Sequence, residues 1–142
     1  MAYLTRSDLT PGRIKPDFFA SALDDNNDGV EDTGLDSQII GQACLDVDAY
    51  LTRYNPPMAN PPAMVRAAAI AFAGYEIYRR GGFDSSPANP FAKDRDYYRE
   101  QLQKIASGEQ NLGIANEPAT GGPVAVITEQ AKTNSSSGQL LY

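Results

Sequence analysis

Residues 60–82 read NPPAMVRAAAIAFAGYEIYRRGG, a pattern typical of a central helix. Pro61 and Pro62 suit a first helical turn, with Asn60 as the expected N-cap. The basic pair before Gly81 complements the negative end of the helix dipole, and the two glycines end the helix. Because the many alanines carry little side-chain bulk, neighbouring helices can approach closely. We therefore expect this helix to lie at the centre of the fold.

Two further helices are predicted on either side of this segment. Residues 37–54 place apolar side chains three and four positions apart, which predicts a helix that Asp36 or Ser37 caps and residues 55–57 end. Residues 89–107 predict another helix, whose charged side chains form a solvated face. Its apolar edge is predicted to contain Phe91, Tyr98, Leu102 and Ile105.

These elements predict a mainly α fold, a bundle of three longer helices with short helices near Thr5 and Pro16, in one domain over residues 1–114. Residues 115–142 are too polar to offset the entropy of ordering, so they predict an extended C-terminal tail. Two interpretations stay open: a free tail, or one that docks on a partner and adds a strand at residues 124–128. The docking side chains would be Val124, Val126, Ile127, Leu140, Leu141 and Tyr142.

Composition argues against an enzyme. The 142 residues include no histidine, no tryptophan and one cysteine, which excludes histidine-based catalysis, Cys–His pairs, His-ligated zinc and an internal disulfide. Cys44 lies on an apolar helical stripe, which favours a small buried hydrophobe over a reactive thiol. A hydrolase that uses carboxylates alone is a remote third hypothesis, because nothing indicates a sugar cleft. We expect a protein without catalytic function.

Charge is distributed unevenly along the chain. The net charge is −6, with ten acids and four bases in residues 1–60, but five acids and seven bases in residues 61–108. A sequence pI of about 4.5 argues against a dedicated nucleic-acid binder. The longest apolar stretch, residues 67–74, is far shorter than the ~20 residues that span a bilayer. We therefore expect a soluble protein with no membrane partner.

The most specific motif is the acidic segment of residues 24–32, DDNNDGVED. Its spacing matches the first nine positions of an EF-hand loop, with Gly29 at the sharp turn. Position 12, which should hold a bidentate glutamate, is Leu35. Two interpretations remain: a metal-free loop of Asx turns, or a weak Ca²⁺ site. The metal ligands would then be Asp24, Asn26, Asp28, Asp32 and the carbonyl oxygen of Val30.

The order of these motifs resembles the Mu-like phage family of head–tail joining proteins, the adaptors or connectors of tailed bacteriophages. The resemblance covers residues 3–114 and leaves out the tail. The segments that carry it are Thr5, Asp8 and Leu9, residues 28–30, residues 48–51, the helix from Pro61 and Pro62 to Tyr78, residues 105–108, and Leu112 with Gly113.

The resemblance implies a structural role in the neck of a virion. Such an adaptor assembles as a ring, usually of about twelve copies (12-fold), between the portal protein and the stopper or tail-completion protein. Double-stranded DNA would pass through the lumen without sequence-specific binding, and no cofactor is implied. The protein would be made in the cytoplasm of the bacterial host. The alternative function, from the residues themselves, is a small calcium-binding module.

Overall fold

The computed structural model describes residues 2–114 and residue 117. Over these residues it contains the α-helices α1 (Pro16–Ala22), α2 (Leu35–Asp48), α3 (Ala63–Arg80) and α4 (Ala92–Ser107), and the short 3-10 helices η1 (Arg6–Asp8) and η2 (Thr52–Tyr54). This part of the chain has no strand, which confirms the mainly α fold. The strand predicted at residues 124–128 lies outside the described residues.

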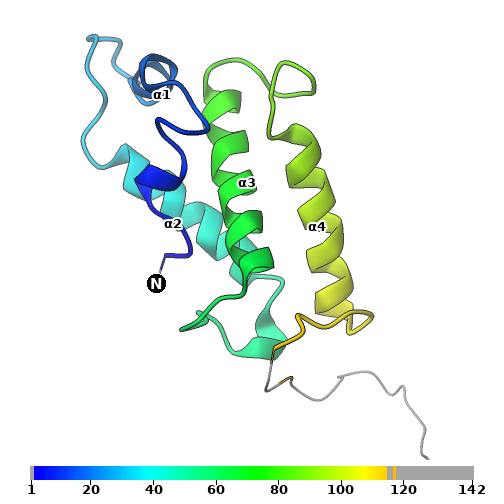
Figure 1. Cartoon of the computed structure of the whole chain (residues 1–142). Coiled ribbons are helices and arrows are strands. Elements are labelled where there is room, and N and C mark those ends of the chain that lie inside the picture. The colour runs from blue at the N-terminus through cyan, green and yellow to red at the C-terminus, as the bar shows by residue number, and fades with distance from the viewer. Residues whose placement is uncertain (1, 115–116, 118–142) are drawn as a thin grey trace, which may run out of the picture.

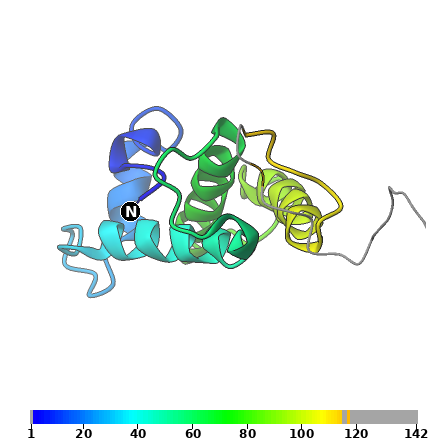
Figure 2. The same ribbon diagram turned by 90° about the horizontal axis from the view of Figure 1, so that it is seen from below.

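α3 is the central helix, as predicted, and α1, α2 and α4 all contact it (Figure 1). Seen from below, α2 lies across α3 while α4 lies beside it (Figure 2). Alanine and glycine are frequent among its buried residues, so the neighbouring helices pack close to its backbone. These buried residues are Val65, Ala68, Ala69, Ala71, Ala73, Gly74 and Ile77.

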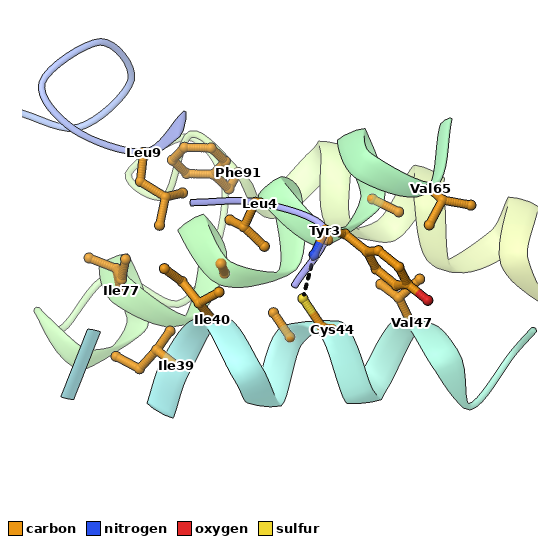
Figure 3. Packing of buried hydrophobic residues seen from close by; sticks show 14 of the residues in the cluster. Tyr3, Leu4, Leu9, Ile39, Ile40, Cys44, Val47, Val65, Ile77 and Phe91 are labelled. Carbon is orange, nitrogen blue, oxygen red and sulfur yellow. Dashed lines mark hydrogen bonds between the residues drawn. The ribbon is translucent and has the colours of Figure 1, made fainter. Parts of the chain in front are cut away.

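The N-terminal segment completes the core by packing on α2 (Figure 3). The backbone N–H of Tyr3 donates a hydrogen bond to Sγ of Cys44 at 3.2 Å. The Tyr3 hydroxyl donates to Asp48 and accepts the backbone N–H of Met58 at 3.0 Å. Leu4 is buried beside these contacts, so residues far apart in the sequence are tied to one face of α2.

The observed bounds of α2 correct two predictions. The helix begins at Leu35, directly after Gly34, whose φ of +82° only glycine adopts readily. Asp36 therefore lies inside the first turn and does not cap it, and the same holds for Ser37. The helix also ends at Asp48, whereas the periodicity predicted it to continue to residue 54.

The positions beyond Asp48 remain buried even though the α-helix has ended. Leu51 is fully buried and Tyr54 packs partly against the core. The chain continues in turns whose backbone hydrogen bonds join residues three apart, as the Leu51 N–H donates to the Asp48 carbonyl at 2.9 Å. These turns keep the side chains of Leu51 and Tyr54 facing the core. Burial of the apolar face was thus predicted correctly, but the type of backbone was not.

The starts of α3 and α4 also differ from prediction. α3 begins at Ala63 after Pro62, and Asn60 is exposed without capping it. α4 begins at Ala92, because Asn89 is buried and uses its side chain to hold the preceding loop. The Asn89 amide nitrogen donates to the carbonyl of Phe83 at 2.8 Å, and its oxygen accepts the Phe91 N–H at 3.0 Å.

Candidate functional site

The acidic loop, residues 24–32, connects α1 to α2. Oxygen atoms of Asp24, Asp28 and Asp32 lie within 4.8 Å of one another. Three of the five predicted metal ligands are therefore brought together by their carboxylates. Leu35, at the position where an EF-hand needs a glutamate, packs partly against the core as the first residue of α2. That position supplies no ligand to the loop.

The polar side chains of the acidic loop bond to its own backbone. Asp24 accepts the N–H of Gly29 at 2.8 Å and that of Asp28 at 3.1 Å. Asn26 also accepts the Asp28 N–H, at 3.2 Å. Partial burial acts to raise the pKa of Asp24, but these backbone N–H groups outweigh it and the pKa is lowered. The carboxylate thus stays ionised, as both a metal site and a turn require.

The acidic loop carries one exposed apolar side chain. Val30 is 66% exposed, while its backbone N–H donates to Asp28 at 2.9 Å. Two arginines fix the flanks of the loop: Arg6 bonds to Glu31, and Arg80 at the end of α3 bonds to Asp25. The loop is thus held as a defined protrusion that presents carboxylates around an exposed valine.

A groove of about 760 Å³ lies between α2, α3 and α4. Its walls contain four arginines but only two acids, so the lining is positive in a chain whose net charge is −6. Tyr50, Phe72 and Tyr75 add partly buried aromatic surface. We call this feature the arginine groove. Its charged residues are Arg79, Arg80, Arg95, Arg99, Asp46 and Glu76.

The arginines of the groove are held by short-range contacts. The Arg95 guanidinium stacks on Tyr75, 3.8 Å from the ring centroid, and its Nε is buried without a hydrogen-bond partner among the described residues. Asp96 accepts from Arg95 at 3.2 Å and from Arg99 at 3.1 Å. Arg79 donates to Glu76 at 2.8 Å. The groove therefore presents ordered guanidinium groups.

Cys44 is buried, as its place on the apolar stripe predicted. Burial is the largest cause that raises the pKa of its thiol, so the protonated form is favoured. A raised pKa lowers the fraction of thiolate, which is the nucleophilic form. Cys44 is therefore part of the core.

The predicted docking residues of the C-terminal tail, Val124 to Tyr142, lie outside the described residues. The chain that leads to them is anchored before it leaves the described part. Leu112 and Ile114 pack partly against the core. The Tyr54 hydroxyl donates to Glu117, and its oxygen accepts the Leu112 N–H at 2.9 Å. This contact crosses the domain boundary predicted at residue 114.

Sequence reasoning missed the arginine groove and the role of Asn89. The sequence pattern predicts Arg79 and Arg80 as complements of the helix dipole, and Arg95 and Arg99 as part of a solvated face. The groove forms only when three helices pack together, which no local pattern reveals. Asn89 gave one signal, since an asparagine before a proline favours a turn over a helix start.

A comparison with protein families finds a match over residues 3–128 to the family described as Bacteriophage Mu, Gp36. The match extends past residue 114, where the motif-based resemblance ended, and includes the apolar cluster at residues 124–127. No curated protein and no solved structure matches the chain. In the part of the chain that the structure describes, no helix is both long and apolar enough to cross a bilayer. The chain belongs to the bacteriophage Mu Gp36 family.

Proposed function

We propose that this protein is a head–tail adaptor of a tailed phage, which forms a ring between the portal and the stopper or tail-completion protein. The observation that carries the proposal is membership of a phage Mu family over residues 3–128. The order of motifs that resembles head–tail joining proteins points the same way. The ring would have about twelve copies and lie in the neck of the virion.

The proposed role is structural and not catalytic. The sequence contains no histidine, and its single cysteine is buried with a raised thiol pKa. Asn89, a buried polar side chain, bonds to three backbone groups and thereby fixes the loop between α3 and α4. These features favour a scaffold that presents surfaces to other chains.

The charge of the chain suits passage of DNA without tight binding. With a net charge of −6, a ring of such subunits releases few counterions from DNA and exerts little sequence-independent attraction on it. A weakly attractive lumen lets the duplex slide during packaging and ejection.

The adaptor role is tested by removing the gene from the phage or prophage that encodes this chain. We expect lysates with DNA-filled heads and separate free tails, and restoration of joined particles when the full chain is supplied in trans. Electron microscopy of the lysate gives the readout. Normally joined virions in the absence of the chain would refute the proposal.

A second candidate function, Ca²⁺ binding by the acidic loop, is favoured by the convergence of Asp24, Asp28 and Asp32. Isothermal titration with calcium, and thermal unfolding in millimolar calcium, test it on the full chain. Binding should give heat and a higher melting temperature, and both should vanish in the Asp28→Asn/Asp32→Asn variant. Absence of heat and of any thermal shift in the wild type eliminates this candidate.

A further inference from the structure

The acidic loop and the arginine groove are complementary in charge. Residues 24–36 contain six acids and no base, whereas the lining of the groove contains four arginines and two acids. The loop also carries an exposed Val30, and the groove offers aromatic surface. A protruding acidic element with one exposed apolar side chain and a groove of opposite charge thus occur in the same molecule.

The acidic loop borders one end of the arginine groove, where Arg80 bonds to Asp25, whereas the α4 wall of the groove lies on the far side of the subunit. The loop between α1 and α2 projects from one side of the molecule, and α4, which supplies Arg95 and Arg99, forms the other side (Figures 1 and 2). One loop therefore cannot reach the α4 wall of its own groove without rearrangement. A contact between the loop of one copy and the α4 wall of another joins two different surfaces, so it is heterologous and can repeat from copy to copy.

We propose that the acidic loop of one copy docks into the arginine groove of the next copy, and that this contact joins neighbouring subunits. The inference rests on the proposed ring, and it identifies the acidic loop and the arginine groove as the two surfaces through which neighbouring subunits of that ring contact each other. Guanidinium groups of Arg79 and Arg99 pair with loop carboxylates, and Val30 packs on Tyr75.

An ion pair between the groove and the acidic loop already exists within one subunit. Arg80, at one end of the groove, already bonds to Asp25 of its own acidic loop. The contact between copies extends the same chemistry to the other arginines of the groove. Their guanidinium groups are ordered by Asp96, Glu76 and the Tyr75 ring, so little side-chain entropy remains to be lost on docking.

The test uses two charge-reversal variants of the full chain. The groove variant is Arg79→Glu/Arg99→Glu, whose side chains are 51% and 43% exposed and pair only with surface acids. The loop variant is Asp28→Lys/Val30→Lys; both residues are exposed, and among the described residues the Asp28 carboxylate accepts one hydrogen bond, from the Val30 N–H. A matched control, Arg13→Glu/Arg66→Glu, reverses two arginines of a separate groove between α3 and α4.

Self-association is measured by sedimentation equilibrium up to millimolar protein at low and high salt. We expect the wild type and the control to associate, and to associate less in high salt. Each charge-reversal variant alone should associate at least about tenfold more weakly. A one-to-one mixture of the two variants should regain association, because an acidic loop then meets a basic groove and a basic loop meets an acidic groove. Misfolding of either variant cannot produce that recovery.

Several outcomes overturn the inference. They are a wild type that stays monomeric throughout, variants that associate normally, or a mixture that stays as weak as its components. A chain lacking residues 118–142 must keep its self-association. If it loses association while the charge-reversal variants keep theirs, the C-terminal segment is the connecting element and the loop is not.

Failure of this contact is distinguishable from failure of the adaptor role. If charge reversal leaves self-association intact but removal of the gene separates heads from tails, the adaptor proposal stands and the contact is wrong. If the mixture recovers association but heads and tails join without the chain, the contact stands and the adaptor role falls.

Discussion

Gly74 of α3 lies directly against the ring of Phe91, the residue that precedes α4. A Cβ atom at Gly74 would come within 2.6 Å of that ring, closer than real side chains approach. Phe91 is itself buried and has little room to move. The absence of a side chain at this one position therefore determines how closely the start of α4 can pack on α3.

We expect Gly74→Ala to lower the free energy of unfolding by about 1–3 kcal/mol, because the Phe91 ring must shift. Gly41→Ala is the matched control: it also lies inside a helix, but nothing lies within 4 Å of its added methyl group. That substitution should raise stability by about 0.5–1 kcal/mol. Urea unfolding measures both. Equal effects of the two substitutions would contradict the proposed close contact.

Tyr3 makes stability depend on alkaline pH. Burial, followed by its hydrogen bond to Asp48, raises the pKa of Tyr3 to about 12. Between pH 10 and that value the unfolded chain loses the phenol proton while the folded chain keeps it, so stability falls as pH rises. Below pH 10 the contribution is fully present.

Tyr3→Phe should therefore flatten the loss of stability between pH 10 and pH 12. Tyr97→Phe, at a tyrosine that is 55% exposed, should leave the slope as in the wild type. Denaturant unfolding at a series of pH values gives the comparison. A small slope should persist in the Tyr3 variant, because burial also raises the pKa of Tyr54. Identical slopes for wild type and Tyr3→Phe would refute the assignment.

At the scale of the elements, periodicity predicted the faces of the helices better than their ends. The predicted stripe is buried from Ile40 to Leu51 and partly buried at Tyr54, yet α2 stops at Asp48 and begins after Gly34. Both differences arise from backbone geometry: a glycine with positive φ at one end and 3-10 turns at the other. These depend on tertiary packing, which overrides the local preference for helix.

In the candidate site too, features set by the local sequence could be predicted, whereas features set by the packing of the helices could not. The acidic loop is contiguous in sequence, and carboxylate oxygens of Asp24, Asp28 and Asp32 lie within 4.8 Å of one another. The arginine groove draws its residues from three helices, and its place depends on how α2 crosses α3. Only the packed structure brings Arg79 and Arg99 to the same groove.

Arg53 connects η2 to the end of α4. Its Nε donates to the carbonyl of Ile105 at 3.1 Å, and its guanidinium also reaches Asn111 at 3.1 Å. The side chain thereby adds a second hydrogen bond to a carbonyl group in the last turn of α4, which also accepts the Gly108 N–H at 3.2 Å. It stacks near Tyr54 as well, with 5.4 Å to the ring centroid.

We expect Arg53→Lys to lower the free energy of unfolding by about 1–2 kcal/mol, because a lysine cannot reproduce the fork of donors. Arg66→Lys, on the exposed surface of α3, should change it by less than about 0.5 kcal/mol. Hydrogen exchange at residues 105–112 should increase in the Arg53 variant alone. Unchanged exchange there would show that Arg53 does not hold this end of α4.

For the whole molecule, the helical part should fold without the C-terminal tail. Deletion of residues 115–142 should preserve the helical circular dichroism but lower the melting temperature, because Tyr54 and Ile114 lose their contacts with Glu117. Deletion of residues 118–142 keeps those contacts and serves as the control. If the protein has the proposed adaptor role, both deletions should impair its binding to the portal, measured by co-purification. Loss of most of the helical signal would show that residues 1–114 do not fold independently of residues 115–142.

The shielded thiol of Cys44 offers a built-in reporter of local opening. Because the Tyr3 amide and the N-terminal segment cover its sulfur, a colorimetric disulfide reagent can attack only after that segment detaches. The rate of colour development then measures how often detachment occurs. The same protection permits a maleimide dye to label a newly introduced surface cysteine selectively, with the native sulfur left in place.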